Sequence, residues 1–320
     1  MRKMLIAFLL LTATLPSLRA QRVETVPFGD FEHWTVRHIR ESAVLGGNVR
    51  TLYVVGPDET IDKNEPYDYR RTIWASSNAY ARVMGVTKTS VTVEPERGPS
   101  GTCARLSTRF ASCQVAGVAE IKVLATGALY WGRMLEPITG VKDPYSFMDW
   151  GIPFTKRPSA LVLDCKAELP RTGILTKGTT FQQKEFPGED PCQIMLLLQK
   201  RWEEADGTVH ALRVGTAVRR ISRSTDWLRS LRVPVIYGDA RKQPGFGAGM
   251  GLLQGERALY TVNSKGRRTP ILEEGWAEPG TPCTHAVLQI TAGCQGAFTG
   301  APGNTLWVDN VRLEYPDPAD

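Results

Sequence analysis

The sequence has 320 residues, of which 42% are hydrophobic and 22% are charged. This composition supports a folded core and excludes a disordered chain. The 39 basic and 33 acidic residues give a net charge of +6. The basic residues are scattered, and the densest group, residues 219–223, is short, so no patch indicates a nucleic-acid partner.

The first twenty residues follow the pattern of a secretory signal peptide. Arg2 and Lys3 precede an apolar run over residues 4–11, and residues 17–20 supply a cleavage site before Gln21. We therefore expect an exported protein, in the periplasm, on the outer surface or secreted. A buried N-terminal helix is the alternative. The mature chain would hold 36 basic and 33 acidic residues, a net charge of +3, and no later stretch is apolar enough for a transmembrane helix.

Hydrophobic residues alternate with a period of two along most of the remaining chain, which predicts β-strands separated by Gly- and Pro-rich turns. The expected strands cover residues 90–93, 103–108, 118–124, 160–167, 193–200, 231–237, 285–291 and 305–315. Residues 193–204 are the best helix candidate, but the leucines at 196–198 also suit a strand buried on both faces. This pattern predicts an all-β fold, a sandwich or jelly roll, in a single domain over residues 21–320.

Five blocks of the chain resemble a bacterial family known as the putative carbohydrate metabolism domain. They are residues 29–34 (GDFEHW), 126–132 (TGALYWG), 150–158 (WGIPFTKRP), 226–237 (from Asp-Trp to RVPVIY) and 303–311 (GNTLWVDNV). The resemblance implies a jelly-roll β-sandwich like those of carbohydrate-binding modules. It also implies a role in handling glycans, with a carbohydrate as the partner.

Four residues in or near the two central blocks are the candidate glycan-binding site: Trp131, Tyr145, Trp150 and Arg157. Sugar rings stack on aromatic side chains, while their hydroxyl groups need a few polar partners. Residues 143–150 read as a loop, where core packing explains an aromatic side chain less readily. The alternative is that the tryptophans are core or loop anchors.

Two acidic residues stand on otherwise apolar strand faces. Alternation places Asp309 with Trp307, Val311 and Leu313, and Glu32 beside Trp34. A buried carboxylate needs hydrogen-bond donors or a cation, so Glu32 and Asp309 are candidate ligands of a structural calcium ion, and no other cofactor is expected. The alternative is a β-bulge that turns one acid outward, or a carboxylate that accepts hydrogen bonds from backbone amides.

The six cysteines form an even set in a chain expected to be exported, which predicts disulfide bonds. Their spacing in sequence favours the pairs Cys103–Cys113, Cys165–Cys192 and Cys283–Cys294. Unpaired buried thiols are the alternative. No C-x-x-C motif indicates a zinc site.

These patterns favour an exported, non-catalytic glycan-binding protein. A structural or adhesive protein that binds other cell-surface proteins is one alternative. A glycoside hydrolase is another, because hydrolysis needs two carboxyl groups and the chain offers Asp143, Asp149, Asp239, Glu273 and Glu274. No spacing selects a pair among these acids, and the adjacent Glu273 and Glu274 read as solvated loop residues.

Overall fold

The computed structural model describes residues 22–115, 119–140, 144–179 and 182–316. Most regular structure in these residues is β-strand, so the predicted all-β class is confirmed. The helical turns there are short 3-10 helices: η1 (Ala43–Leu45), η2 (Tyr69–Arg71), η3 (Pro144–Phe147), η4 (Ala240–Lys242) and η5 (Gly255–Arg257). No helix in the described part of the chain is long and apolar enough to cross a membrane. The predicted signal peptide, residues 1–20, lies outside the described residues.

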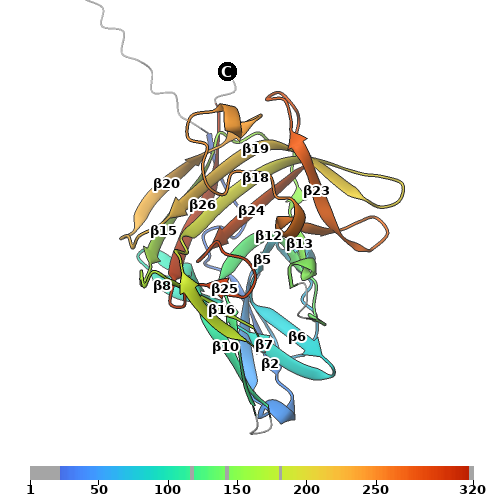
Figure 1. Ribbon diagram of the computed structural model, residues 1–320, viewed down its shortest axis with the longest axis vertical. Helices are drawn as coiled ribbons and strands as arrows, with labels where there is room; N and C mark the ends of the chain where they lie inside the picture. Colours follow the sequence, from blue (N-terminus) through green and yellow to red (C-terminus); the bar gives the residue numbers. More distant parts are fainter. Residues whose placement is uncertain (1–21, 116–118, 141–143, 180–181, 317–320) are drawn as a thin grey trace, which may run out of the picture.

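Eight strands form a jelly roll of two antiparallel sheets (Figure 1). Sheet A has the order β9 (Gly101–Ser107), β26 (Thr305–Tyr315), β15 (Ala160–Glu168), β20 (Leu228–Pro234). Sheet C has the order β12 (Ala128–Met134), β24 (His285–Thr291), β18 (Cys192–Glu203), β19 (Val209–Ile221). Counted along the chain, these orders are 1-8-3-6 and 2-7-4-5, so the first and last strands of the roll are neighbours, as in a jelly roll.

Shorter strands extend both sheets. In sheet A, β8 (Val93–Gly98) pairs with β9, and β1 (Arg22–Thr25) pairs with β26. In sheet C, β5 (Trp74–Ser76) and β13 (Met148–Trp150) pair with β12, and β14 (Ile152–Pro153) pairs with β24. At the opposite edge of sheet C, β19 pairs with both β21 (Ile236–Tyr237) and β23 (Arg268–Trp276), and β23 pairs with β22 (Tyr260–Val262).

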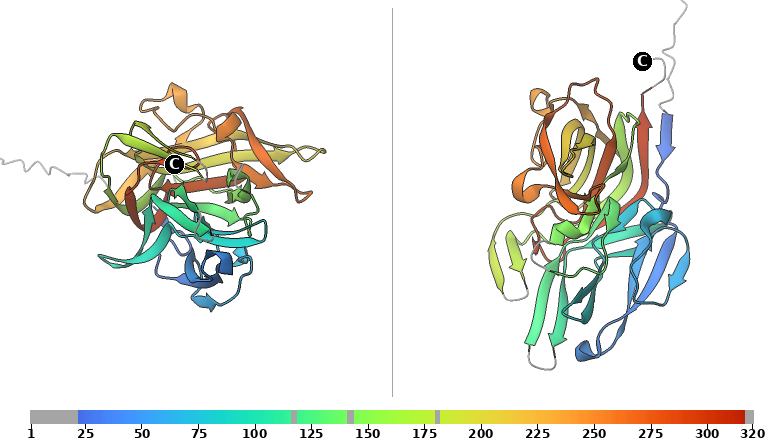
Figure 2. Two further views of the ribbon diagram at one scale, coloured as in Figure 1. Left: turned by 60° about the horizontal axis from the view of Figure 1, so that its bottom comes forward. Right: turned by 90° about the vertical axis from the view of Figure 1, so that its right-hand side faces the viewer.

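Four small sheets complete the molecule, and most of their strands lie below the jelly roll in Figure 1 and in the right-hand view of Figure 2. The first two are β2 (Trp34–Arg40) with β3 (Val49–Val55) and β4 (Glu59–Ile61), and β6 (Ala79–Val83) with β7 (Val86–Ser90). The others are β10 (Arg109–Val115) with β11 (Ala119–Ala125), and β16 (Ile174–Gly178) with β17 (Gln183–Pro187) and β25 (Thr299–Gly300).

The core shows why residues 193–204 form a strand and not a helix. Ile194, Leu196 and Leu198 of β18 point between the two sheets, where they meet apolar residues of sheet A. Met195 and Leu197 point to the other side of sheet C and join a second core with residues of β12 and β13. A central strand covered on both faces has a continuous apolar run, which sequence periodicity alone does not separate from a buried helix.

The last strand has the predicted bounds but not the predicted alternation. Leu306 and Val308 face the main core, and so do Val311 and Leu313. Strict alternation would put one residue between Val308 and the next core residue, but two lie there, Asp309 and Asn310. Asn310 has a positive φ of 54°, and the pairing of β26 with β15 shifts register at this point, as in a β-bulge.

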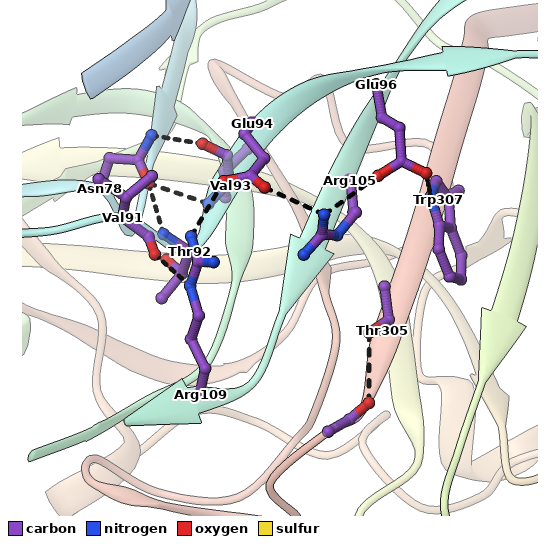
Figure 3. Close-up of polar contacts among 11 residues, drawn as sticks. Asn78, Val91, Thr92, Val93, Glu94, Glu96, Arg105, Arg109, Thr305 and Trp307 are labelled. Carbon is purple, nitrogen blue, oxygen red and sulfur yellow. Dashed lines mark hydrogen bonds and ion pairs between the residues drawn. The ribbon is translucent and has the colours of Figure 1, made fainter. Parts of the chain in front are cut away.

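The bulge turns Trp307 away from the core, which corrects its predicted position. Its indole nitrogen donates a hydrogen bond to Glu96 Oε1 at 2.9 Å. Figure 3 shows this tryptophan at the end of a row of charged side chains, in which Arg105 lies between Glu94 and Glu96. Trp307 is therefore only partly buried, on the outer face of sheet A.

The predicted disulfide bonds are absent. Cys103, Cys165, Cys192, Cys283 and Cys294 carry free thiols, and the side chain of Cys113 lies outside the described residues. Cys283 and Cys294 lie beyond opposite ends of β24, which has seven residues and therefore spans about 20 Å or more. Cys165 and Cys192 come from different sheets but lie in the same core, near enough to interact electrostatically, and both are free thiols. The strands of Cys103 and Cys113 also belong to different sheets. For Cys283 and Cys294, closeness in sequence misled the pairing because an extended strand carries its two ends far apart.

Candidate functional site

The four predicted glycan-binding residues do not come together at the surface. Trp131 is 1% exposed and packs in the main core between Trp74 and Phe154, with ring centroids 6.2 and 6.3 Å away. Trp150 is also 1% exposed, and its ring lies against Tyr130 at 4.5 Å. Neither ring has a face open to a ligand. The structure therefore corrects the expectation that these two tryptophans are exposed, because both are core residues, as in the alternative interpretation.

The other two predicted residues lie in different surroundings. Tyr145, in η3, packs against the second core, and burial raises the pKa of its hydroxyl to about 12. Arg157 is exposed, and its guanidinium stacks on the ring of Tyr237 at 3.7 Å from the centroid. It also donates a hydrogen bond to the carbonyl of Pro279. Arg157 thus joins two segments that are far apart in sequence.

A pocket opens where these segments meet, at the edge of sheet C. Here β19 exchanges one neighbour for another: Arg213 pairs with Trp276 of β23, and Gly215 pairs with Tyr237 of β21. The two strands diverge from this point and leave a cavity of about 390 Å³ between them. This volume is within the range of small-molecule sites in proteins. Its lining comprises Tyr237, Asp239, Arg241, Lys242, Gln243, Leu252, Glu274, Gly275, Trp276, Ala277, Glu278 and Pro279.

Two aromatic side chains form walls of this pocket, and each is held from behind. The Tyr237 hydroxyl donates a hydrogen bond to the carbonyl of Pro158 at 2.7 Å, while Arg157 covers one face of the ring. The guanidinium of Arg213 lies 5.5 Å from the centre of the Trp276 ring. Both aromatic residues are partly exposed, so they offer apolar surface in a fixed orientation.

A buried ion pair lies beneath Trp276. The side chains of Arg213 and Glu273 are 0% and 1% exposed, and Arg213 Nε donates to Glu273 Oε1 at 2.7 Å. Gln199 and the backbone amide of Leu253 donate to the same carboxylate. Burial alone would raise the pKa of Glu273, but the charge and hydrogen bonds of Arg213 hold it below its usual value. This network ties β23 to the loop that precedes β22, and it corrects the prediction that Glu273 is a solvated loop residue.

The rim of the pocket is polar. Asp239 precedes η4 and accepts hydrogen bonds from the backbone amide and the guanidinium of Arg241, which lower its pKa. Glu274 Oε1 lies 2.5 Å from His210 Nδ1. Gly238 allows the two walls to approach, because its φ is +78° and a Cβ there would lie 2.8 Å from the ring of Pro279. Aromatic walls with a charged rim suit a ligand that has both apolar faces and hydroxyl groups.

The carboxyl groups with a raised pKa lie away from this pocket. Burial raises the pKa of Asp190, whose oxygens accept hydrogen bonds from the amides of Cys294 and Ala301. Burial also raises the pKa of Asp309 to about 6, assisted by the nearby charges of Asp164 and Glu32. Neither acid lines the cavity, so neither supplies it with a proton donor.

The two candidate calcium ligands, Glu32 and Asp309, are close enough to interact electrostatically. Asp309 is 2% exposed and accepts a hydrogen bond from the amide of Asn310 at 2.8 Å. Glu32 is exposed and accepts one from the amide of Thr102 at 3.0 Å. These are the features of the alternative interpretation, a bulge and carboxylates bound to backbone amides. The described residues hold no group of three or more His, Cys, Asp or Glu side chains suited to a metal.

The fold and this pocket define a class: a jelly-roll β-sandwich with an aromatic-walled pocket at one sheet edge. The chain belongs to the family described as the putative carbohydrate metabolism domain, whose sequence profile matches residues 31–210. This membership associates the protein with carbohydrates. The matched segment ends within β19, so every residue that lines the pocket lies beyond it.

Solved structures show a similar fold. A crystal structure of a putative glycoside hydrolase from Bacteroides thetaiotaomicron aligns with a TM-score of 0.50 at 20% identity, over 88% of this chain and 71% of that chain. A putative glycoside hydrolase from Bacteroides vulgatus gives 0.41 at 16% identity, over 91% and 94% of the two chains. A family 11 carbohydrate-binding module of a Clostridium thermocellum cellulase gives 0.30 at 10%, over 77% and 89%. Only the first score supports a shared fold, and it says nothing of activity. No curated protein matches the sequence.

Proposed function

We propose that this is an exported glycan-binding protein that holds a sugar ring in the pocket between β21 and β23. The observation that carries the proposal is the pair of partly exposed rings, Tyr237 and Trp276, each backed by an arginine. A pyranose has apolar faces that stack on such rings, and its hydroxyl groups would meet Asp239, Arg241 and Glu274 at the rim. Export rests on the signal-like pattern of residues 1–20 and is tested by mass spectrometry of the mature N-terminus.

The decisive experiment compares two tryptophans that have similar environments. Trp276→Ala removes a wall of the pocket, whereas Trp227→Ala removes a partly exposed ring outside the pocket that also has an arginine over it, Arg229 at 5.4 Å. We expect Trp276→Ala to weaken glycan binding at least about tenfold on a glycan array and by calorimetry. Equal losses in both variants, or no binding by the unaltered chain, would refute the proposal.

Glycoside hydrolysis is the second candidate, because Asp239, Glu274 and Glu278 all line the cavity. A hydrolase needs one carboxyl group that stays protonated near the working pH. Asp239 is the wrong choice for that role, since Arg241 lowers its pKa. Asp190 and Asp309, whose pKa burial raises, lie outside the cavity. For these two reasons we favour binding without catalysis. Release of reducing sugar by the purified chain, lost in Glu274→Gln or Glu278→Gln, would favour the hydrolase instead.

A further inference from the structure

The end of the molecule away from β19 and β23 exposes apolar side chains at two turns. In the described part of the chain eight large apolar residues are exposed, and three of them gather here: Val44 at 45%, Val49 at 49% and Met84 at 97%. We call these three residues the apolar tip. In Figure 1 the connection between β2 and β3 (blue), which holds Val44 in η1, lies at the lower end, whereas β19 and β23 lie at the upper end.

Hydrogen bonds hold the two turns side by side. The amide of Ser42 donates to the carbonyl of Thr87 at 3.2 Å, and the amide of Thr87 donates to the hydroxyl of Ser42 at 2.8 Å. Val44 follows Ser42 by two residues, and Met84 precedes Thr87 by three residues at the turn between β6 and β7. The two turns therefore project from the same end of the molecule.

Exposed arginines flank the apolar tip. Arg40 pairs with Val49 across β2 and β3, and Arg50 follows Val49 in β3. Arg82 precedes Met84 by two residues and pairs with Thr87. All three arginine side chains are exposed, so a ligand that contacts the apolar tip also meets their guanidinium groups.

Two acids lie on the same end, and each has a basic partner. Glu41 is 3% exposed and accepts a hydrogen bond from Lys88 Nζ at 3.1 Å. Asp62 lies 2.6 Å from His38 Nδ1. The three arginines and Lys88 thus stand against two acids, which leaves an excess of positive charge around the apolar tip.

This combination suits a lipid surface better than a protein. Binding to a membrane surface adds the burial of apolar side chains to the attraction between basic residues and anionic headgroups, and guanidinium groups bind phosphate well. A stable protein interface buries about 800 Å² on each partner. Three apolar side chains on two projecting turns offer little area of that kind, but they can enter a fluid bilayer without a complementary partner surface.

We infer that this end of the molecule binds the surface of an anionic membrane. The apolar tip enters the headgroup region, and Arg40, Arg50 and Arg82 contact lipid phosphates. This inference is independent of the proposed glycan binding. It also orients the molecule, because the pocket beside β19 and β23 then points away from the bilayer.

The test is flotation of the mature chain with lipid vesicles, either phosphatidylcholine alone or an equal mixture with phosphatidylglycerol. We expect binding to the mixed vesicles only, weakened by salt. Met84→Asp and Val44→Asp should each weaken it about tenfold, and Arg82→Gln about fivefold. The matched controls should not change it: Val23→Asp, on β1 and 51% exposed, and Arg223→Gln, an exposed arginine after β19.

Three outcomes would overturn the inference. They are no binding of the unaltered chain to the mixed vesicles, equal binding to both kinds of vesicle, and a loss in Val23→Asp as large as in Val44→Asp. The pocket variant Trp276→Ala should bind vesicles as the unaltered chain does, so a failure here and a failure of glycan binding are distinguishable. Melting temperatures show whether each variant has folded.

Discussion

The two edges of sheet C contain tryptophans in opposite environments. At the covered edge, formed by β12 and β13, Trp131 packs between the two sheets against Trp74 and Phe154, and Trp150 packs in the second core with Phe147 of η3. Both tryptophans are 1% exposed. At the open edge, formed by β19 and β23, Trp276 is partly exposed and faces a cavity. The residue type is the same and the sheet is the same. The difference shows that the elements packed over a strand decide whether an aromatic side chain is core or surface.

The largest effect should come from the covered edge. Trp150→Ala should lower the free energy of unfolding by about 3–5 kcal/mol, because it leaves a cavity against Tyr130 in the second core. Chemical denaturation measures this loss. A variant that unfolds at the same denaturant concentration as the unaltered chain would mean that the covered edge is open in solution.

Next in size is the ion pair beneath the open edge. Glu273→Gln should cost about 3 kcal/mol, because it leaves the fully buried Arg213 without an opposite charge. The matched control is Glu274→Gln, the adjacent and half-exposed acid, which should change stability by less than about 0.5 kcal/mol. If the two variants melt at the same temperature, the assigned difference between Glu273 and Glu274 is wrong.

Asp309 sharpens the comparison, because it is buried as Glu273 is but has no arginine bonded to it. Its folded pKa is raised to about 6, so folding favours the protonated acid. Stability from this group is complete below about pH 4 and is lost as the pH rises through 6, a change of about 3 kcal/mol. In chelating buffer, Asp309→Asn should therefore be the more stable protein at pH 7.5, with the advantage disappearing below pH 4.

Calcium reverses the sign of that result if Glu32 and Asp309 bind it. The ion would then stabilise the unaltered chain at pH 7.5, and Asp309→Asn would be the less stable protein in millimolar calcium. Melting curves recorded with calcium and with chelator distinguish the two cases. If the unaltered chain gives identical curves in both buffers, Glu32 and Asp309 do not bind calcium, and the bulge and the backbone hydrogen bonds explain their positions.

The smallest of these effects on stability should come from Trp202, in the strand next to the open edge. Trp202 of β18 is 38% exposed and stacks on His210. Trp202→Ala should lower the free energy of unfolding by about 1 kcal/mol, since it loses this stack but leaves no cavity in the core. Differential scanning calorimetry beside Trp150→Ala gives the contrast directly. A loss as large as that of Trp150→Ala would mean that another surface covers Trp202.

The sequence by itself determined the fold class and much of the strand pattern. Period-two alternation located β26 at residues 305–315 and β24 at residues 285–291 with the observed bounds. The bounds of these strands were predictable because their apolar runs end at Gly- and Pro-rich turns, whereas the face that each side chain takes was not. The resemblance to the carbohydrate metabolism family added the jelly roll, which the strand orders of sheets A and C confirm.

Only the tertiary structure decided the rest. The bulge at Asn310 exchanged the faces of Trp307 and Val308, and no local signal marks it in the sequence. Cys283 and Cys294 are separated because β24 carries them beyond its opposite ends. The pocket combines residues 237–243 with residues 274–279, which meet only because β21 and β23 pair with successive parts of one strand. Alternation reports the two faces of a strand, whereas a site depends on what lies above each face, and long-range packing fixes that.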